Sequence, residues 1–250
     1  MRAKPSSSLR WRRPPRPRIP PERPRDPRVR GEKGAGEMEV EAKLEAPNRA
    51  TFRSLSRRRR LGRYDLNVVG VRDLETIYLD TAHKDLLRRR IALRIRKSER
   101  RVEMTIKLPG EAARGIHRRP ESTWRLARMP VLPLRPRGRA LRGRLPRALR
   151  TAELGPLVGT RVRRRALVVC RRGRGAPLAE IDLDRVEFFL PSTAPARSRR
   201  SYEIEVELLG GEEADLQRIV RALREDYALK PSRQSKFERA LRWAKIRRGR

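Results

Sequence analysis

Cysteine is almost absent from this sequence. The 250 residues contain one, Cys170, which excludes an internal disulfide and is typical of a protein from a reducing compartment. Long apolar runs are missing as well, since none approaches the roughly 18 residues that cross a bilayer as a helix. The basic N-terminus lacks the apolar segment of a secretory signal. We therefore expect a cytoplasmic protein with no membrane partner.

Acidic and aromatic residues are also scarce. Thirty Asp and Glu stand against 66 Lys and Arg, which gives a formal net charge of +36. A charge of this size predicts an anionic partner: nucleic acid, a phosphate compound or a membrane surface. Aromatic residues make up only 4%, and the interleaving of aromatic with basic residues that grips single-stranded nucleic acid is missing. Because a GC-rich coding bias also raises arginine content, the placement of the charges is more informative than their number.

The length allows one domain of ordinary size and a tail. Residues 1–37 hold eight prolines and twelve Lys or Arg against four acids, so we predict a disordered basic tail there. Two interpretations of the tail stay open: an arm that contacts nucleic acid or polyphosphate, and sequence upstream of a translation start at Met38. The folded domain is predicted over 38–246, and a basic end over 247–250.

The spacing of apolar residues predicts the regular elements. Strands are expected over 38–46, 65–71, 74–80, 91–96, 102–108, 116–126, 160–169, 178–189 and 202–209. Helices are expected from Asn48 to about Leu61, at 84–87 and over 212–227, with a final segment over 235–246. The stretch 127–150 is predicted to be a loop, with a short helix near 145–154. Short connections between most strands favour an α+β fold, with an antiparallel sheet or barrel and helices outside.

The predicted strands alternate apolar with charged residues. In the first strand, Val40, Ala42 and Leu44 share one face and the charged residues occupy the other. A single strand of this kind is typical of a sheet with one solvated face. The charges are sorted by strand, however, whereas a merely soluble surface mixes signs. The acid-rich strands carry Glu39 and Glu41, then Glu180, Asp182 and Asp184, then Glu203, Glu205 and Glu207; the basic strands carry Arg94 and Arg96, Lys107, and the run Arg161–Arg165.

A sheet face crowded with carboxylates is unstable unless a cation lies among them. Hard oxygen ligands select Mg²⁺ or Mn²⁺, whereas zinc is disfavoured because Cys170, His83 and His117 show no ligand spacing. A basic wall opposite a metal-binding acidic wall is the arrangement that phosphoryl transfer needs, since arginine and lysine hold phosphate oxygens. The sequence therefore predicts a closed barrel with a charged interior that takes a polyanion and divalent metal ions.

Several short motifs resemble those of one known family. Glu39-x-Glu41-x-Lys43 resembles the ExExK signature of the CYTH superfamily, the triphosphate tunnel metalloenzymes. Further similar motifs follow in the same order: Tyr78-Leu79-Asp80-Thr81, Ala92 to Arg96, Thr105-Ile106-Lys107, Arg119-Pro120-Glu121, Asp182-Leu183-Asp184, Glu203 to Glu207, and Ser235-Lys236-Phe237. The resemblance covers residues 38 to about 245. It implies a closed eight-stranded antiparallel tunnel that cleaves or cyclises triphosphates with Mg²⁺ or Mn²⁺.

The resemblance also implies roles for individual residues. The catalytic residues would be Glu39, Glu41 and Lys43. Phosphate would be held by Lys43, Arg94, Arg96, Lys107, Arg119, Lys236 and an arginine at position Arg163 or Arg164, where the strand pattern leaves the register open. The metal ligands would come from Glu39, Glu41, Asp182, Asp184, Glu203, Glu205 and Glu207.

The leading functional hypothesis is hydrolysis of a small polyphosphate, inorganic triphosphate first, by a metal-activated water. Thiamine triphosphatase and a class IV type adenylate cyclase are alternatives, although few aromatic residues are present to build a pocket for a ring. A non-catalytic module that binds polyphosphate or nucleic acid is the alternative from another class, and it would show a steep dependence on salt.

Overall fold

The computed structural model describes residues 37–246, apart from residue 114, residue 174 and residues 192–199. The predictions for the basic tail before Glu37 and for the end at 247–250 fall outside these residues. Within the described part no helix is long and apolar enough to cross a membrane.

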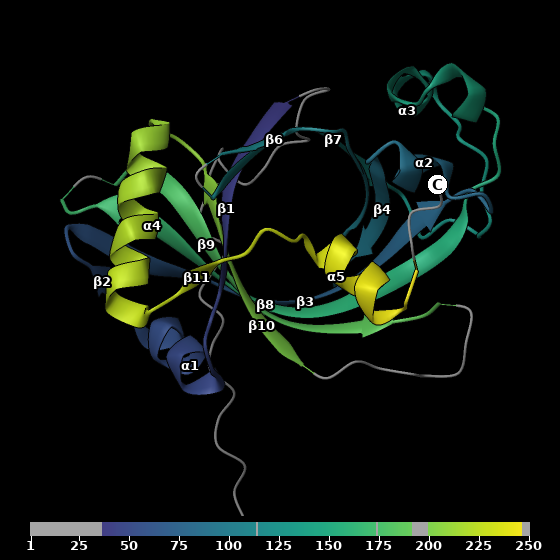
Figure 1. The fold of residues 1–250 in the computed structure, drawn as a ribbon. Coiled ribbons are helices and arrows are strands. Elements are labelled where there is room, and N and C mark those ends of the chain that lie inside the picture. The colour runs from purple at the N-terminus through teal and green to yellow at the C-terminus, as the bar shows by residue number, and fades with distance from the viewer. Residues whose placement is uncertain (1–36, 114, 174, 192–199, 247–250) are drawn as a thin grey trace, which may run out of the picture. The chain divides into compact units, whose positions relative to one another are not determined.

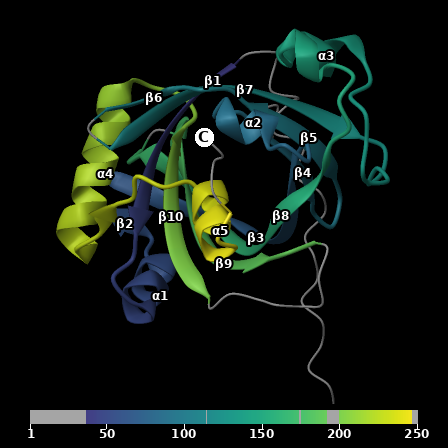
Figure 2. The same cartoon turned by 45° about the vertical axis from the view of Figure 1, so that its right-hand side comes forward.

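Eight antiparallel strands close into a barrel (Figures 1 and 2). They are β1 (Glu37–Glu45), β3 (Tyr64–Asp80), β4 (Ala92–Lys97), β5 (Val102–Lys107), β7 (Ile116–Leu126), β8 (Gly155–Arg171), β9 (Pro177–Phe189) and β10 (Ser201–Leu208). Around the barrel the order is β1-β10-β9-β8-β3-β4-β5-β7, and pairing of β7 with β1 closes it. The short strands β2 (Arg60–Leu61), β6 (Glu111–Ala113) and β11 (Lys230–Pro231) pair at its margins. The predicted closed eight-stranded barrel is confirmed.

Five helices and one 3₁₀ turn are found among the described residues. They are α1 (Arg49–Arg57), α2 (Asp85–Arg88), α3 (Arg139–Arg144), the 3₁₀ turn (Arg147–Leu149), α4 (Glu213–Tyr227) and α5 (Lys236–Trp243). The Asn48 side chain caps α1 by accepting from Thr51 N at 2.9 Å, as the sequence predicts. Glu212 and Asp215 form a capping box at α4, and Ser235 and Glu238 form one at α5.

The barrel buries apolar side chains on its outer face. One cluster joins α1 and α4 to the outer faces of several strands, and its members include Leu55, Leu216, Leu44 and Ile204. A second cluster packs the connection from β7 to β8 against β4 and β5, through Leu141, Leu145, Leu93 and Ile106 among others. Because apolar positions alternate with polar ones along each strand, this outward burial turns the charged positions inward.

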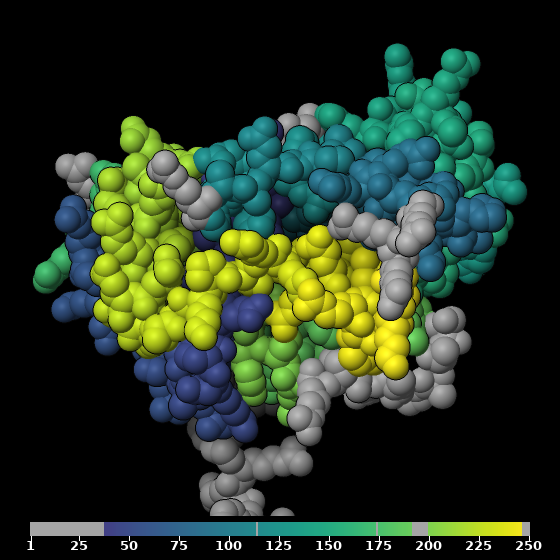
Figure 3. Space-filling model, viewed as in Figure 1, coloured from purple at the N-terminus to yellow at the C-terminus, as the bar shows by residue number. Residues whose placement is uncertain are grey.

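The C-terminal helix α5 lies inside the ring of strands in both ribbon views. Phe237 stacks on Tyr78 with ring centroids 4.4 Å apart, and this pair belongs to a cluster that also includes Val158, Val162 and Phe188. In the space-filling view (Figure 3) the yellow C-terminal segment fills the space between the teal strands above and the green strands below. The helix therefore brings its first residue, Lys236, into the barrel interior.

Three predicted elements differ from the structure. The strands expected at 65–71 and 74–80 are one 17-residue strand, β3, with a bulge between Val68 and Gly70. Within 145–154, where a short helix is expected, the structure has the 3₁₀ turn Arg147–Leu149, and the separate helix α3 lies just before it, in the predicted loop. The first helix ends at Arg57, and Leu61 belongs to β2. In each case long-range pairing or packing, which the local pattern does not contain, decides the boundary.

Candidate active site

The strand register places the acid-rich strands side by side. In the barrel β9, β10 and β1 are neighbours. Glu205 of β10 is opposite Asp182 on one side and Lys43 on the other, and Glu207 is opposite Glu41. All the predicted metal-ligating carboxylates except Glu205 are buried, at 0–9% relative exposure: Glu39, Glu41, Asp182, Asp184, Glu203 and Glu207. Residues from three separate parts of the sequence thus form one acidic wall that faces the interior.

Arg164 of β8 is the cation bound most tightly to this wall. Its Nε and Nη2 donate to Asp184 Oδ1 and Oδ2 at 2.8 and 2.7 Å, and Nη2 also donates to Glu205 Oε2 at 3.1 Å. A further ion pair joins Arg164 Nη1 to Asp182. The Arg164 side chain is 8% exposed. This bidentate contact settles which arginine of the Arg161–Arg165 run enters the tunnel.

Lys236 reaches the same carboxylates from the other side. Its Nζ lies 2.9 Å from Asp184 Oδ2, 2.7 Å from Glu205 Oε1 and 3.5 Å from Glu203 Oε2. The capping box fixes this lysine at the first turn of α5. Burial opposes the ionised form of Asp184, yet Arg164 and Lys236 together lower the pKa of its carboxyl. Asp184 is therefore a carboxylate held between two cations.

A second ion-pair group links β1, β5 and β7. Lys107 Nζ lies 2.5 Å from Glu39 Oε2 and 2.6 Å from Glu121 Oε2. Lys43 pairs with Glu41 on its own strand. Although burial disfavours the charge of Lys107, Glu39 and Glu121 raise the pKa of its ammonium. The three residues of the ExExK motif thus lie in the interior, where Lys107 and Lys43 balance the two glutamates.

Arg94 and Arg96 differ from these cations. They point into the tunnel from β4, where Arg94 is opposite Tyr78 and Arg96 opposite Thr76. Neither makes an ion pair with a carboxylate within the described part of the chain. The buried Nε of Arg94 has no hydrogen-bond partner there, and the Nε of Arg96 donates only to Thr76 Oγ1 at 3.3 Å. Burial, together with Arg94 and Arg164 nearby, lowers the pKa of Arg96 to about 10.

Burial raises the pKa of three carboxyls on the acidic wall, Glu39, Asp182 and Glu203. Burial raises the pKa of Glu39 to about 7, against the lowering influence of Lys107. Burial also raises the pKa of Asp182 to about 8, against that of Arg164. Glu41 and Glu205 are opposite cases, since lysines and Arg164 lower their pKa values although burial opposes it. Near pH 7 the protons that burial keeps on Glu39 and Asp182 therefore reduce the negative charge of the acidic wall.

The donor chemistry of this wall fits a hard divalent cation. Asp182 Oδ1 is buried and has no hydrogen-bond partner among the described residues. However, no group of three or more His, Cys, Asp or Glu side chains in the described residues is already arranged to hold a metal. Mg²⁺ typically takes one or two carboxylates and completes its shell with phosphate oxygens and water. The residues therefore fit a metal that binds together with its anion, after exchange of ion pairs such as that of Lys107 with Glu39.

Of the residues assigned to phosphate binding, one lies on the outer face of the barrel and another, Arg119 opposite Glu39, has its guanidinium bound to the backbone. Arg163 points away from the tunnel, with its side chain 55% exposed and paired to Asp73 at 3.6 Å. Arg119 is bonded to backbone carbonyls: its Nε donates to Leu108 O at 2.5 Å, and its Nη2 donates to Arg90 O and Lys107 O at 2.9 and 3.0 Å. The structure therefore does not bring Arg163 to the site, and it gives Arg119 a role in holding the ends of β4 and β5.

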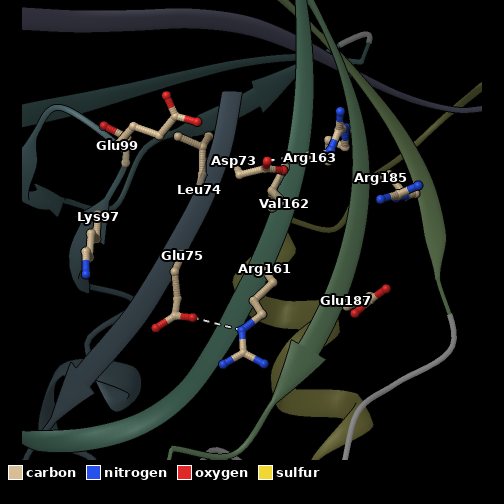
Figure 4. A pocket seen from close by; sticks show the side chains of 11 residues that line it. Asp73, Leu74, Glu75, Lys97, Glu99, Arg161, Val162, Arg163, Arg185 and Glu187 are labelled. Atoms are coloured by element: carbon tan, nitrogen blue, oxygen red, sulfur yellow. Dashed lines mark hydrogen bonds and ion pairs between the residues drawn. The ribbon is translucent and has the colours of Figure 1, made fainter. Parts of the chain in front are cut away.

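A pocket of about 460 Å³ lies on the outer side of β3, β8 and β9 (Figure 4). Arg163 and Asp73 form one ion pair in it, and Arg161 Nε and Glu75 Oε2 form another at 2.8 Å. Arg185 and Glu187 add one charge of each sign. Because its charges are largely matched, this pocket is not a second phosphate site comparable with the tunnel.

Sequence reasoning missed one cation of the interior, Arg239. Its Nη1 lies 2.7 Å from Glu203 Oε1. The signal was present, since Arg239 follows Lys236 by three residues and shares its helix face. Glu121 of β7 contacts Lys107.

Comparison with known proteins agrees with this architecture. The family model of the CYTH domain matches residues 37–241, and the chain belongs to this family. Comparison with curated proteins finds none that matches the chain in sequence.

Three solved structures share the fold. The adenylyl cyclase candidate HpAC1 from Hippeastrum, described as having a dominant triphosphatase activity, is 18% identical with a TM-score of 0.57; the match covers 82% of this chain and 96% of that one. An adenylate cyclase candidate from Bacillus halodurans is 19% identical with a TM-score of 0.54, covering 82% and 98%. The PH1819 protein of Pyrococcus horikoshii is 18% identical with a TM-score of 0.50, covering 81% and 99%. At these identities the likeness concerns the fold.

Proposed function

We propose that this protein hydrolyses the terminal phosphoanhydride bond of a triphosphate, with inorganic triphosphate as the first candidate. The observation that carries the proposal is the pair Arg94 and Arg96, two cations inside the tunnel that have no carboxylate partner among the described residues. They face a tunnel interior whose acidic wall is crowded with buried carboxylates. Cations left unpaired within a barrel indicate an anionic ligand, and arginine matches phosphate oxygens in geometry.

In this proposal the chain's own residues bind and orient the substrate. Arg94 and Arg96 hold phosphate oxygens through several N–H donors each, and they stabilise the negative charge that grows on the departing diphosphate. Lys107 and Lys43 lie where a phosphate can replace Glu39 and Glu41 as their partner. Glu39 and Glu41, freed from these lysines, are then available as ligands of a divalent cation.

A divalent cation, Mg²⁺ or Mn²⁺, would be held by carboxylates of β1, β9 and β10. The residues available are Glu39, Glu41, Asp182, Asp184, Glu203, Glu205 and Glu207. When bound, such an ion activates water as a nucleophile and neutralises phosphate charge. Arg164 and Lys236 keep Asp184 and Glu205 oriented, so these two carboxylates belong to the frame around the metal as well as to its candidate ligands.

The aromatic residues favour inorganic triphosphate over a substrate with a ring. Tyr78 and Phe237 are buried against each other, and Phe188 is buried in the same cluster. Their faces pack α5 and leave no open stacking surface for a nucleobase or a thiazolium ring. The triphosphatase activity described for HpAC1, which has this fold, supports hydrolysis of a triphosphate.

Adenylate cyclase activity is the second candidate, because two proteins with this fold are described as candidates for it. A panel of triphosphate, ATP, thiamine triphosphate and long-chain polyphosphate, each with Mg²⁺ or Mn²⁺, distinguishes the possibilities. We expect metal-dependent phosphate release, fastest from triphosphate. Cyclic AMP and pyrophosphate from ATP would identify a cyclase. Tight polyphosphate binding without phosphate release, with either metal, would identify a binding module.

Matched glutamate variants test whether the tunnel does the chemistry. We expect Glu41→Gln to abolish phosphate release while the protein stays folded, as measured by circular dichroism. The control is Glu75→Gln, the same change at an exposed glutamate on the outer side of β3, and it should retain activity. Equal activities for the two variants would contradict the proposed site.

A further inference from the structure

The connection between β7 and β8 concentrates positive charge, and Glu153 near its end is its one acidic residue. Residues 125–152, which we call the arginine segment, contain nine arginines and neither Asp nor Glu. The segment includes the end of β7, the helix α3 and the 3₁₀ turn. Seven of its arginines are exposed: Arg125, Arg128, Arg135, Arg137, Arg139, Arg142 and Arg147.

Several exposed arginines of β8 have acidic partners. On β8, Arg161 pairs with Glu75 and Arg163 with Asp73, while Arg171 pairs with Asp215 at 2.8 Å. In the described part of the arginine segment, one ion pair is found, between Arg135 and Glu153 at 3.9 Å. Residues 46–64 and 154–179 are also rich in arginine and free of acids, but several of their arginines pair with acids from other parts of the chain, as Arg58 does with Asp226. The arginine segment differs in having, among the described residues, one such pair for nine arginines.

The arginine segment is also firmly attached to the barrel. Leu141, Leu145 and Leu149 are buried, at 2–7% exposure, against the outer faces of β4 and β5. In the two ribbon views α3 lies outside the barrel beside these strands. The leucines therefore face the outer wall of the barrel, and the exposed arginines face solvent. A fixed, one-sided array of cations is the arrangement expected for binding a polyanion, since little ordering is needed on contact.

The array starts at the tunnel. Arg125 is opposite Glu103, and it follows Glu121 and Thr123 at two-residue intervals along β7. By strand alternation Arg125 shares the tunnel-lining face with Glu121, and its exposure places it at the mouth. The neighbouring strands carry Glu103 opposite Arg96. The first residue of the arginine segment therefore lies at the tunnel mouth two strands away from Arg96, with Glu103 between them.

The composition of the arginine segment favours a polyanion that has no nucleobases. No aromatic side chain occurs in residues 125–154, whereas proteins that hold single-stranded nucleic acid stack its bases on aromatic residues. We infer that the arginine segment holds a linear inorganic polyphosphate chain whose terminal phosphates enter the tunnel. The entry of the chain end into the tunnel rests on the proposed triphosphatase function. Binding of polyphosphate to the arginine segment depends on charge and can be measured separately.

Binding and turnover are measured on the full chain with matched triple variants. The test variant is Arg137→Ala with Arg139→Ala and Arg142→Ala. The control is Arg49→Ala with Arg53→Ala and Arg57→Ala, three exposed arginines of α1 that have no ion pair within the described residues. Both variants lose the same charge, so non-specific electrostatics change equally. Binding of end-labelled long-chain polyphosphate is followed by fluorescence anisotropy in EDTA, over a series of salt concentrations.

We expect the test variant to bind long-chain polyphosphate about tenfold more weakly than the control, with the salt slope reduced by roughly two to three. Its KM for long-chain polyphosphate should rise to a similar extent, while its KM for triphosphate should match that of the control. Equal binding by the two variants would overturn the inference. Loss of RNA binding with polyphosphate binding kept would also overturn it, and would identify nucleic acid as the partner.

The two proposals fail in different ways. If the wild-type protein releases no phosphate from any triphosphate, the proposed function and the feeding of the tunnel are both refuted. A difference between the two triple variants in EDTA would still support the docking surface, because that measurement needs no hydrolysis.

Discussion

Two sides of the tunnel carry buried cations that differ in their partners. On the side of β8, β9 and β10, Arg164 contacts three carboxylates and Lys236 contacts three. On the side of β4, Arg94 and Arg96 contact no carboxylate in the described part of the chain. Both groups lie inside the same barrel, so burial alone does not explain the difference.

This difference in pairing distinguishes cations that hold the acidic wall together, which we call the frame, from cations available to bind a ligand, which we call the binding surface. A cation surrounded by carboxylates is held in the folded protein and is costly to remove, because its partners then stay buried without it. A cation without a partner raises the energy of the empty tunnel, and an anionic ligand relieves this. Arg164 and Lys236 therefore maintain the acidic wall, whereas Arg94 and Arg96 are the groups that gain most from a bound phosphate.

The largest effect is expected from removing Arg164. In Arg164→Met the buried carboxylates of Asp182 and Asp184 lose their main partner, which should lower the free energy of unfolding by about 3–5 kcal/mol. Urea denaturation followed by circular dichroism measures this. The double variant with Asp184→Asn should recover part of the loss, since one uncompensated charge is removed. A stability close to that of the wild type would show that the acidic wall does not depend on Arg164.

Removing the unpaired arginines should lower activity more than stability. Arg94→Ala and Arg96→Ala should each lower kcat/KM for triphosphate by about 100- to 1,000-fold, the range seen when a charge-stabilising donor is lost. Arg96→Ala should keep stability at or above the wild-type value, because burial and the neighbouring Arg94 and Arg164 lower the pKa of Arg96. Arg94→Ala should lose some stability because, although burial opposes it, Glu121 and Glu39 raise the pKa of Arg94. Steady-state kinetics and thermal unfolding measure the two quantities. An inactive variant that is also strongly destabilised would place these arginines in the frame instead.

The pH dependence of stability should reveal the buried carboxyls whose pKa values are raised. Glu39 and Asp182 have pKa values of about 7 and about 8, above their ordinary 4.5 and 3.8. Their protons are bound more tightly in the folded protein, so the stabilisation from protonation is complete below the ordinary values and is lost as pH rises through about 7 and 8. Without metal, Tm should fall between about pH 5.5 and about pH 8.5. Asp182→Asn should flatten this fall, and Mg²⁺ should counter it by binding the ionised form.

A Tm that is constant over this range, both with and without Mg²⁺, would contradict the pH prediction. The matched control is Asp73→Asn, the same change at an exposed aspartate on the outer side of β3. This control should leave the pH profile unchanged.

Strand alternation explains how much of the site the sequence predicts. Once a strand is recognised, Glu39, Glu41 and Lys43 must share a face, and the same holds for Glu203, Glu205 and Glu207. The sorting of charge then indicates a barrel interior. Alternation does not tell which face of a strand points inward when both faces carry charged residues. In Arg163-Arg164-Arg165 both phases give a plausible inward arginine, and only the pairing of β8 with β9 decides for Arg164.

The remaining differences arise from contacts between distant residues. Arg119 has the parity of an interior residue, yet its guanidinium is bound by carbonyls of Arg90, Lys107 and Leu108. Arg239 enters the interior because α5 packs within the barrel. Neither fact is visible in the local sequence, since both depend on which segments meet in three dimensions.

The smallest effect is expected from Arg163→Ala, which compares two neighbouring arginines on one strand. The Arg163 side chain is 55% exposed and its partner Asp73 is 63% exposed, so the ion pair should contribute about 0–1 kcal/mol to stability. Phosphate release should be unchanged, because the side chain lies on the outer face of β8. Urea denaturation and triphosphate kinetics, run beside Arg164→Met, measure both effects. A loss of activity in Arg163→Ala similar to that in Arg94→Ala would mean that β8 presents its other face to the substrate, and the distinction between frame and binding surface would then have to be drawn again.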